Sequence, residues 1–167
     1  HSICVFSDRL GALEKVEDRS LNVHVVRRRF PHDPTLIFRM TGVMRKERPD
    51  IVRTYNWGGV EGMLAARLCG IKAVIHSEHG VEMEEISSPL RRRIIARKAL
   101  FRLCNAVIAV SRKRGEWLIK KAVLDSKKVF IIPNGCSMDK FRPGNSPALR
   151  EKLGIKKTDI VVGSVGA

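Results

Sequence analysis

The side chains best suited to chemistry follow three apolar runs of this sequence. Each run is rich in β-branched residues and gives way to small or polar ones, which is typical of a buried parallel strand that passes into a loop at its carboxyl end. The polar groups at these ends are Thr54, Tyr55 and Asn56; Glu78, His79 and Gly80; and Asn134 with Gly135. Polar groups at the carboxyl ends of neighbouring parallel strands usually face a ligand. The sequence therefore predicts one ligand-binding crevice built from three strand ends.

Strands and helices alternate along the chain that carries these groups. Strand-like runs occupy residues 1–6, 21–26, 50–54, 71–75, 106–110 and 128–132, and helical spacing of apolar residues fills most of the intervals between them. We expect Pro49 to end one helix, Gly70 to follow the next as its C′ residue, and Ser111 to cap the start of a later one. This order predicts an α/β fold, a doubly wound parallel sheet covered on both faces with right-handed crossovers.

The composition changes after Pro143, where glycine, asparagine, serine and proline follow one another in residues 144–147. A short helix is expected near residues 149–153, and residues 160–165 have the apolar pattern of a new strand. We therefore predict a first domain that ends at Pro143 and, over 144–167, a linker with the beginning of a second domain.

Composition limits the class of protein. Of the 167 residues, 44% are hydrophobic and 29% charged, which is typical of a globular domain. No apolar stretch approaches the roughly 20 residues that a membrane-spanning helix requires. The four cysteines are widely spaced and form no C-x-x-C pair: Cys4, Cys69, Cys104 and Cys136. We expect them to be free thiols in a reducing cytosol, and we expect no metal site.

Positive charge is concentrated in one stretch. The formal net charge is +15, and residues 89–121 contain eleven basic residues against one acid. On a helical wheel Arg91, Lys98 and Arg102 share a stripe, although other arginines interrupt the apolar side of the same helix. An anionic membrane surface fits this stripe, since each Lys or Arg adds about 1 kcal/mol at such a surface. A solvated basic face without a partner is the alternative.

The sequence pI of about 10.4 is also compatible with binding to a nucleic acid instead of a membrane. Aromatic residues are only 5% of the chain, no known nucleic-acid motif is present, and the basic stretch lies between two predicted core strands. Nucleic-acid binding is therefore the less favoured of the two anionic-surface interpretations. A basic module that binds an anionic surface without catalysis stays an alternative function.

Five motifs in order resemble glycosyltransferase family 4, the retaining enzymes with two Rossmann-like domains called GT-B. In this sequence the motifs read Arg48-Pro49-Asp50-Ile51-Val52, Ser77-Glu78-His79-Gly80, Ala109-Val110-Ser111, Pro133-Asn134-Gly135 with Phe141 and Pro143, and Val161-Val162-Gly163-Ser164-Val165-Gly166. The resemblance covers nearly the whole chain and implies the amino-terminal, acceptor-side domain. It also implies a piece truncated at both ends, because relatives begin with another strand and a Gly-rich loop and continue into a nucleotide-sugar domain.

The resemblance implies transfer of a sugar from a nucleotide-sugar donor to a saccharide or lipid-linked acceptor, with retention of configuration and without a metal or other cofactor. In polysaccharide or glycolipid synthesis the parent enzyme would be cytoplasmic, with peripheral binding at the inner face of the membrane. The present residues alone are expected to be inactive. A GT-B sugar-nucleotide epimerase is the alternative enzyme, since the part that would distinguish the two lies outside this sequence.

Residue roles follow from the same resemblance. His79 matches the histidine that the family places beside the donor sugar, so we expect it to be the catalytic residue, with Gly80 next to it. Two roles fit Glu78, orientation of His79 or capping of the next turn. Thr54, Tyr55 and Asn56 either bind acceptor hydroxyls or form an ordinary turn.

Asn134 and Gly135 are expected to shape the hinge side of the crevice, with direct substrate contact as the alternative. The glycine is expected to have a positive φ in its turn.

Overall fold

The computed structural model describes residues 1–6, 20–30, 33–79, 91–122, 124–139, 141–144 and 146–163, with side chains from residue 94 onward in the helix that begins at Arg91. The chain forms two compact units, His1–Asn134 and Gly135–Ala167, each of which is considered on its own. Sequence analysis placed the boundary after Pro143, whereas the change in contacts falls after Asn134. All predicted crevice residues except Gly135 thus belong to the first unit.

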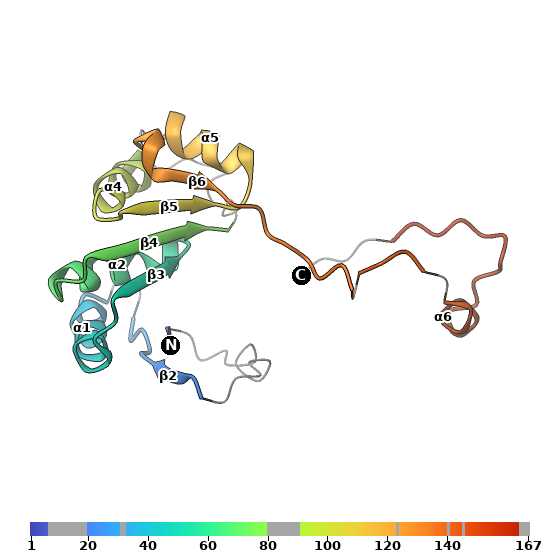
Figure 1. Ribbon diagram of the computed structural model, residues 1–167, viewed down its shortest axis with the longest axis horizontal. Coiled ribbons are helices and arrows are strands. Elements are labelled where there is room, and N and C mark those ends of the chain that lie inside the picture. Colours follow the sequence, from blue (N-terminus) through green and yellow to red (C-terminus); the bar gives the residue numbers. More distant parts are fainter. Residues whose placement is uncertain are drawn as a thin grey trace. The chain divides into compact units, whose positions relative to one another are not determined.

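The first unit contains two parallel sheets (Figure 1). In the smaller sheet β1 (Ser2–Val5) pairs with β2 (Asn22–Val25). The larger sheet has the order β3-β4-β5-β6, formed by Ile51–Tyr55, Ala73–Glu78, Ala106–Ala109 and Val129–Ile131. Every described pair of strands is parallel. The expected α/β class with a Rossmann-like parallel sheet is confirmed.

The helices begin and end where local chemistry predicts. The first unit has α1 (Thr35–Glu47), α2 (Val60–Leu68), α4 (Arg91–Phe101) and α5 (Arg112–Lys120), with short 3-10 turns η2 (Trp57–Gly59) and η3 (Ser126–Lys128). Pro49 follows the C-cap of α1, and Gly70 has a φ of 74° after α2. The Ser111 side chain accepts the Arg114 N–H at the start of α5.

One face of the larger sheet carries the core of the unit. Val74, His76 and Glu78 alternate along β4 and are almost fully buried on this face. The covering helix α2 contacts β3 and β4, α5 contacts β5 and β6, and the α4 residue Phe101 packs 4.8 Å from the His76 ring. Gly115 allows α5 to approach β6 closely, because a Cβ there would lie 2.8 Å from Ile131 Cγ1.

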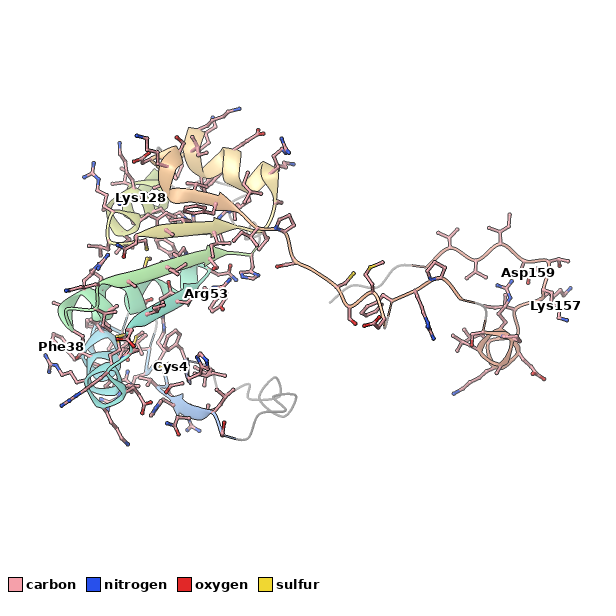
Figure 2. The ribbon with its side chains drawn as sticks, in the orientation of Figure 1. Cys4, Phe38, Arg53, Lys128, Lys157 and Asp159 are labelled. Atoms are coloured by element: carbon pink, nitrogen blue, oxygen red, sulfur yellow. The ribbon has the colours of Figure 1, made fainter. Side chains whose placement is uncertain are left out.

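The other face of the same sheet is less covered by the described residues. Ile51, Tyr55 and Phe130 point to it and are 48–59% exposed. Arg53 lies on this face and donates from Nε to Ser77 Oγ at 3.0 Å (Figure 2). The expectation of cover on both faces thus holds for one face within the described part of the chain.

Two strand predictions differ from the structure. The strand predicted at 71–75 instead extends from Ala73 to Glu78, because polar side chains at its end are buried among partners that periodicity does not reveal. Residues 160–163 of the second unit form no strand, and Ile160 and Val162 are each 93% exposed. A strand requires a neighbour to satisfy its backbone, and no described residue pairs with this segment. The helix of this unit, α6, spans Pro147–Lys152.

Candidate active site

The carboxyl ends of β3 and β4 lie side by side. Their parallel register pairs Tyr55 with Ser77, so the residues that follow the two strands meet at one edge of the sheet. His79, the first residue after β4, is exposed. Its ring lies 5.4 Å from the Tyr55 ring, with the two planes inclined at 49°. An aromatic ring therefore flanks an imidazole that is open to a ligand.

Asn56 joins the two strand ends through both its backbone and its side chain. Its backbone N–H donates to the Ser77 carbonyl at 2.9 Å, and its Oδ1 accepts the His79 N–H at 2.8 Å. Its φ is 51° and its ψ is −176°, a combination that residues other than glycine rarely adopt. The main chain of His79 is thus tied directly to the end of β3.

Beneath the exposed residues Tyr55, Asn56 and His79 lies a chain of buried polar side chains. Thr54, which precedes Tyr55, is 7% exposed, and its Oγ1 lies 2.7 Å from His76 Nδ1. The other ring nitrogen of His76, Nε2, lies 3.4 Å from Glu78 Oε1. Because an ionised carboxylate only accepts hydrogen bonds, His76 Nε2 is the donor in this pair.

Glu78 connects this chain to two helices. Its carboxylate, 2% exposed, pairs with Arg97 Nε of α4 at 3.3 Å and with Arg114 of α5. The guanidinium carbon of Arg97 lies 5.0 Å from the Trp57 ring centre and 5.6 Å from that of Trp117, and that of Arg114 lies 4.4 Å from Trp117. The tryptophan faces add favourable cation–π contacts to the ion pairs. One buried carboxylate thus holds β4, α4 and α5 together beneath His79.

The charge on Glu78 is stabilised in the folded protein. Burial by itself raises the pKa of Glu78, but the hydrogen bond from His76 and the positive charges of Arg114 and Arg97 outweigh it and lower the pKa from 4.5 to about 2. A lowered folded-state pKa means that this contribution to stability is complete above pH 4.5 and is lost as the pH falls toward 2.

We expect protonation of Glu78 to contribute to unfolding of the protein at low pH. Between pH 4.5 and 2, the free energy of unfolding should fall more steeply in the native protein than in Glu78→Gln, which has no carboxyl to protonate. Denaturant unfolding at several pH values measures both slopes. Because Asp33 also has a pKa lowered to about 2, only the difference between the two proteins belongs to Glu78. Equal slopes would contradict the assignment.

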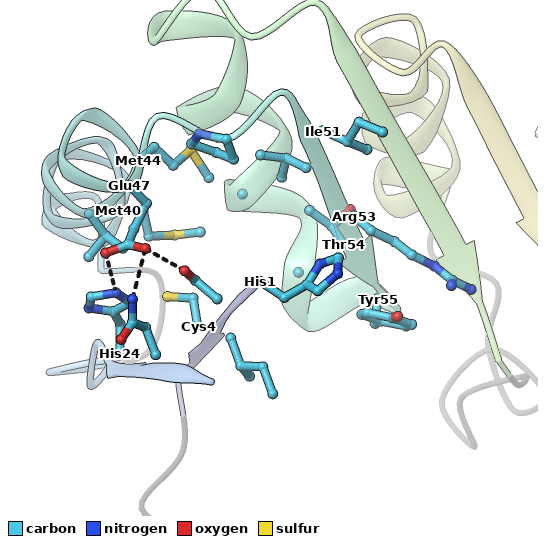
Figure 3. Close-up of a pocket in the computed structure, with 18 of the residues that line it drawn as sticks. His1, Cys4, His24, Met40, Met44, Glu47, Ile51, Arg53, Thr54 and Tyr55 are labelled. Carbon is cyan, nitrogen blue, oxygen red and sulfur yellow. Dashed lines mark hydrogen bonds and ion pairs between the residues drawn. The ribbon is translucent and has the colours of Figure 1, made fainter. Parts of the chain in front are cut away.

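A cleft of about 1100 Å³ opens between β1 and β3, and Tyr55 and Asn56 are among the residues that line it (Figure 3). Met40 and Met44 of α1 line it together with Cys4 of β1. At one end the Glu47 carboxylate accepts hydrogen bonds from Ser2 and Asn22 and lies 3.1 Å from His24 Nε2. Among the described strands β1 pairs only with β2 and β3 only with β4, so two strand edges face this cleft unpaired.

A family comparison decides the relationship of the chain. Residues 1–140 match the family model described as Glycosyltransferase Family 4. The chain belongs to this family. The sequence resemblance that rested on short motifs is therefore confirmed.

Two curated relatives show what other proteins with this domain do. The chain is 33% identical over 129 residues to UDP-Gal:alpha-D-GlcNAc-diphosphoundecaprenol alpha-1,3-galactosyltransferase of Escherichia coli, covering 74% of this chain and 33% of that enzyme. It is 24% identical over 126 residues to D-inositol 3-phosphate glycosyltransferase of Geodermatophilus obscurus, covering 70% of this chain and 28% of that enzyme. This family 4 chain thus spans about a third of the length of its curated relatives.

Solved structures support the fold. A glycosyltransferase from Rickettsia africae superposes with a TM-score of 0.70 at 20% identity, covering 94% of this chain and 42% of that one. Anabaena Alr3699/HepE, solved in complex with UDP and glucose, gives a TM-score of 0.67 at 18% identity, with 92% and 42% covered. The family 4 chain therefore has the fold of one part of a GT-B glycosyltransferase.

The structure brings three of the predicted crevice residues together at its surface, namely Tyr55, Asn56 and His79. The side chains of Thr54 and Glu78 are instead buried, and their polar atoms are bonded to other protein groups. Orientation of the His79 side chain by the Glu78 carboxylate is likewise not seen, because that carboxylate faces Arg97 and Arg114. Alternation along each strand explains this, since adjacent residues point to opposite faces.

The remaining predicted crevice residues are less informative. Gly80 lies outside the described residues. Asn134 and Gly135 are exposed, and they fall on either side of the boundary between the two units. The expected positive φ at Gly135 is wrong, because the described glycines with positive φ are Gly70 and Gly154. Residues 132–137 form no tight turn that would require it.

The basic stretch divides into buried and exposed members. Lys98 and Arg102 are exposed, as a surface contact requires, whereas the Arg91 side chain lies outside the described part. Arg97 and Arg114 are 1% and 3% exposed and serve the Glu78 cluster, so these two do not add to a surface patch. The signal in the sequence was the position of Arg97 four residues before Phe101 on the apolar side of the helix, where an arginine requires a buried partner.

No helix in the described part of the chain is long and apolar enough to cross a membrane. No group of three or more His, Cys, Asp or Glu side chains in the described ranges is arranged to hold a metal ion.

Proposed function

We propose that this chain is the acceptor-side domain of a retaining glycosyltransferase that moves a sugar from a nucleotide-sugar donor to a lipid-linked or saccharide acceptor. Membership of family 4 supports a transferase, and the exposed His79 between Tyr55 and Asn56 at a strand-end edge is the observation that carries the site. The named activity of the Escherichia coli relative supports a hexose donor and a lipid-linked acceptor. Cell-surface polysaccharide or glycolipid synthesis would use such a reaction.

The proposed reaction requires this domain to bind and orient the sugar and does not require it to supply a strong base. In glycosyl transfer with retention the barrier lies in separating positive charge on the sugar from negative charge on the leaving diphosphate, so groups that stabilise charge matter more than a strong base. The diphosphate itself can accept the acceptor proton. His79 would hydrogen-bond the donor sugar, while Tyr55 would bind acceptor hydroxyls. No metal or organic cofactor enters this proposal.

The full-length enzyme is the correct material for a test, since this chain spans about a third of its relatives. UDP-hexoses and an undecaprenyl-diphosphate-linked GlcNAc are the first donors and acceptor to assay, with NMR of the new glycosidic bond to read its configuration. Acceptor-dependent release of UDP with an α-linked product from an α-linked donor would support the proposal. Interconversion of the nucleotide sugar without an acceptor would identify an epimerase instead. Residues 1–167 alone are expected to transfer no sugar.

We further propose that exposed basic residues of α4 hold the enzyme at an anionic membrane surface, on the cytoplasmic side where nucleotide sugars are made. In Lys98→Glu/Arg102→Glu, binding to vesicles containing phosphatidylglycerol should weaken at least about 30-fold, since each lost cation costs about 1 kcal/mol. Vesicle co-sedimentation of the full-length enzyme measures this. The matched control is Lys152→Glu/Lys157→Glu, exposed lysines of the other unit. Equal losses in both variants would indicate net charge alone, and preference for duplex DNA would remove the membrane proposal.

A further inference from the structure

Asn56 differs from the other predicted crevice residues because its hydrogen bonds go to the neighbouring strand end. The backbone N–H donates to Ser77, and the side-chain oxygen accepts from His79, so the two bonds bracket Glu78 at the end of β4. The acceptor oxygen of Asn56 is therefore already engaged. This arrangement favours a role inside the protein for that oxygen over a first contact with substrate.

The backbone of Asn56 is the second observation. Among described residues other than glycine, only Asn56 and Arg48 have a positive φ. Arg48 follows the last residue of α1, where a left-handed residue commonly ends a helix. Asn56 instead follows a strand, and its positive φ with a ψ of −176° turns the chain toward η2. Unusual backbone conformations outside helix ends are often retained at functional sites.

We propose that Asn56 is a positioning residue for His79. Its positive-φ backbone places Oδ1 where it accepts the His79 N–H, and this bond fixes the main chain of His79 with the imidazole beside the Tyr55 ring. The inference rests on the proposed function, in which the His79 imidazole meets the donor sugar. A small displacement of such a group has a large effect, because about 1 Å of misplacement can cost about 10²-fold in rate.

Three substitutions separate the hydrogen bond from the backbone conformation. Asn56→Asp keeps an acceptor oxygen and tolerates a positive φ, Asn56→Gly tolerates the φ but removes the oxygen, and Asn56→Ala removes the oxygen and adds strain. In the full-length enzyme we expect near-native kcat for Asn56→Asp and a loss of about 10²-fold for the other two, with KM little changed. Asn56→Gly should cause no further loss in a His79→Ala background, since the two act as a unit.

The kinetic outcomes that overturn the proposal are specific. A raised KM at unchanged kcat in Asn56→Gly would indicate direct substrate binding. Full kcat in Asn56→Gly would show that the bond is unnecessary. A further loss in the His79→Ala background would mean that Asn56 acts on another group.

A measurement without substrate keeps the inference separate from the proposed function. Hydrogen exchange at the His79 amide should accelerate about tenfold in Asn56→Gly and stay near the native rate in Asn56→Asp. Asn105→Gly is the matched control, because Asn105 Oδ1 accepts the Val74 N–H at 2.9 Å near the start of β4, away from the end that carries His79. It should change exchange at Val74 and leave kcat intact. Unchanged exchange at His79 in Asn56→Gly overturns the inference, whereas absence of sugar transfer by the native enzyme overturns the proposed function.

Discussion

Replacing Glu78 by alanine is expected to lower the free energy of unfolding of the first unit by about 3–5 kcal/mol. The substitution removes the acceptor for Arg97, Arg114 and His76, which are 0–3% exposed. These donors would keep the cost of their burial and lose the carboxylate that offsets it. The Glu78 carboxylate contacts groups from β4, α4 and α5, so one side chain joins three elements.

The measurement is hydrogen exchange of β4 and β5 amides in the full-length protein under increasing urea. Glu78→Gln keeps a side-chain oxygen of the same reach and should lose less stability than Glu78→Ala. Glu116→Ala is the control on α5 itself, because Glu116 is 54% exposed and only approaches Lys120, at 3.7 Å. Its stability should not change measurably, as is usual for exposed pairs. A similar small effect of Glu78→Ala would show that the buried cluster contributes little to stability.

Features decided by local chemistry were predictable from the sequence. Proline after α1 and glycine after α2 act through their own backbone conformations, and serine before α5 acts through a side-chain hydrogen bond to the N–H three residues later; all three perform the expected role. The alternation of apolar runs with helical spacing likewise sufficed for the α/β class. These signals do not depend on which residues meet in three dimensions.

Features decided by tertiary partners were not predictable in the same way. Charge counting treated Arg97 and Arg114 as surface cations, but each is buried because Glu78 lies opposite it on another element. The same carboxylate was expected in a loop, since hydropathy ends the strand at residue 75, whereas paired polar groups extend β4 to Glu78. The sequence predicts a site at the carboxyl end of this strand. It does not indicate that alternate residues there face the core and the exposed side of the sheet.

This two-layer arrangement gives the exposed and buried residues different expected phenotypes. Substitutions in the buried layer of Thr54, His76 and Glu78 should act mainly on stability, because these side chains contact only protein groups in the described structure. Substitutions of the exposed residues Tyr55, Asn56 and His79 should act mainly on kcat or KM. His79 is the clearest test of this separation, since it is directly bonded to Glu78 in the chain yet points to the opposite side.

Replacing His79 by alanine in the full-length enzyme should lower kcat by about 10²-fold or more and leave the stability of the unit nearly unchanged. The rate effect is that expected for loss of one positioned donor where charge develops. Stability should change little because the ring is exposed and its backbone bond to Asn56 is kept. Initial rates of UDP release at saturating acceptor, with unfolding followed in parallel, measure both quantities.

His24→Ala is the matched control for His79→Ala. His24 lies in β2, pairs with Glu47 in the cleft between β1 and β3, and has no contact with Tyr55 or Asn56 among the described interactions, although these two residues also line that cleft. Its removal should reduce stability slightly and leave kcat near the native value. If His79→Ala kept native kcat, or if His24→Ala caused the larger loss, the reaction would not take place at the β4 strand end, and the cleft between β1 and β3 would become the site to examine. A loss of kcat confined to His79→Ala would instead assign the chemistry to the exposed residues Tyr55, Asn56 and His79, which follow β3 and β4 beside the buried Glu78 carboxylate.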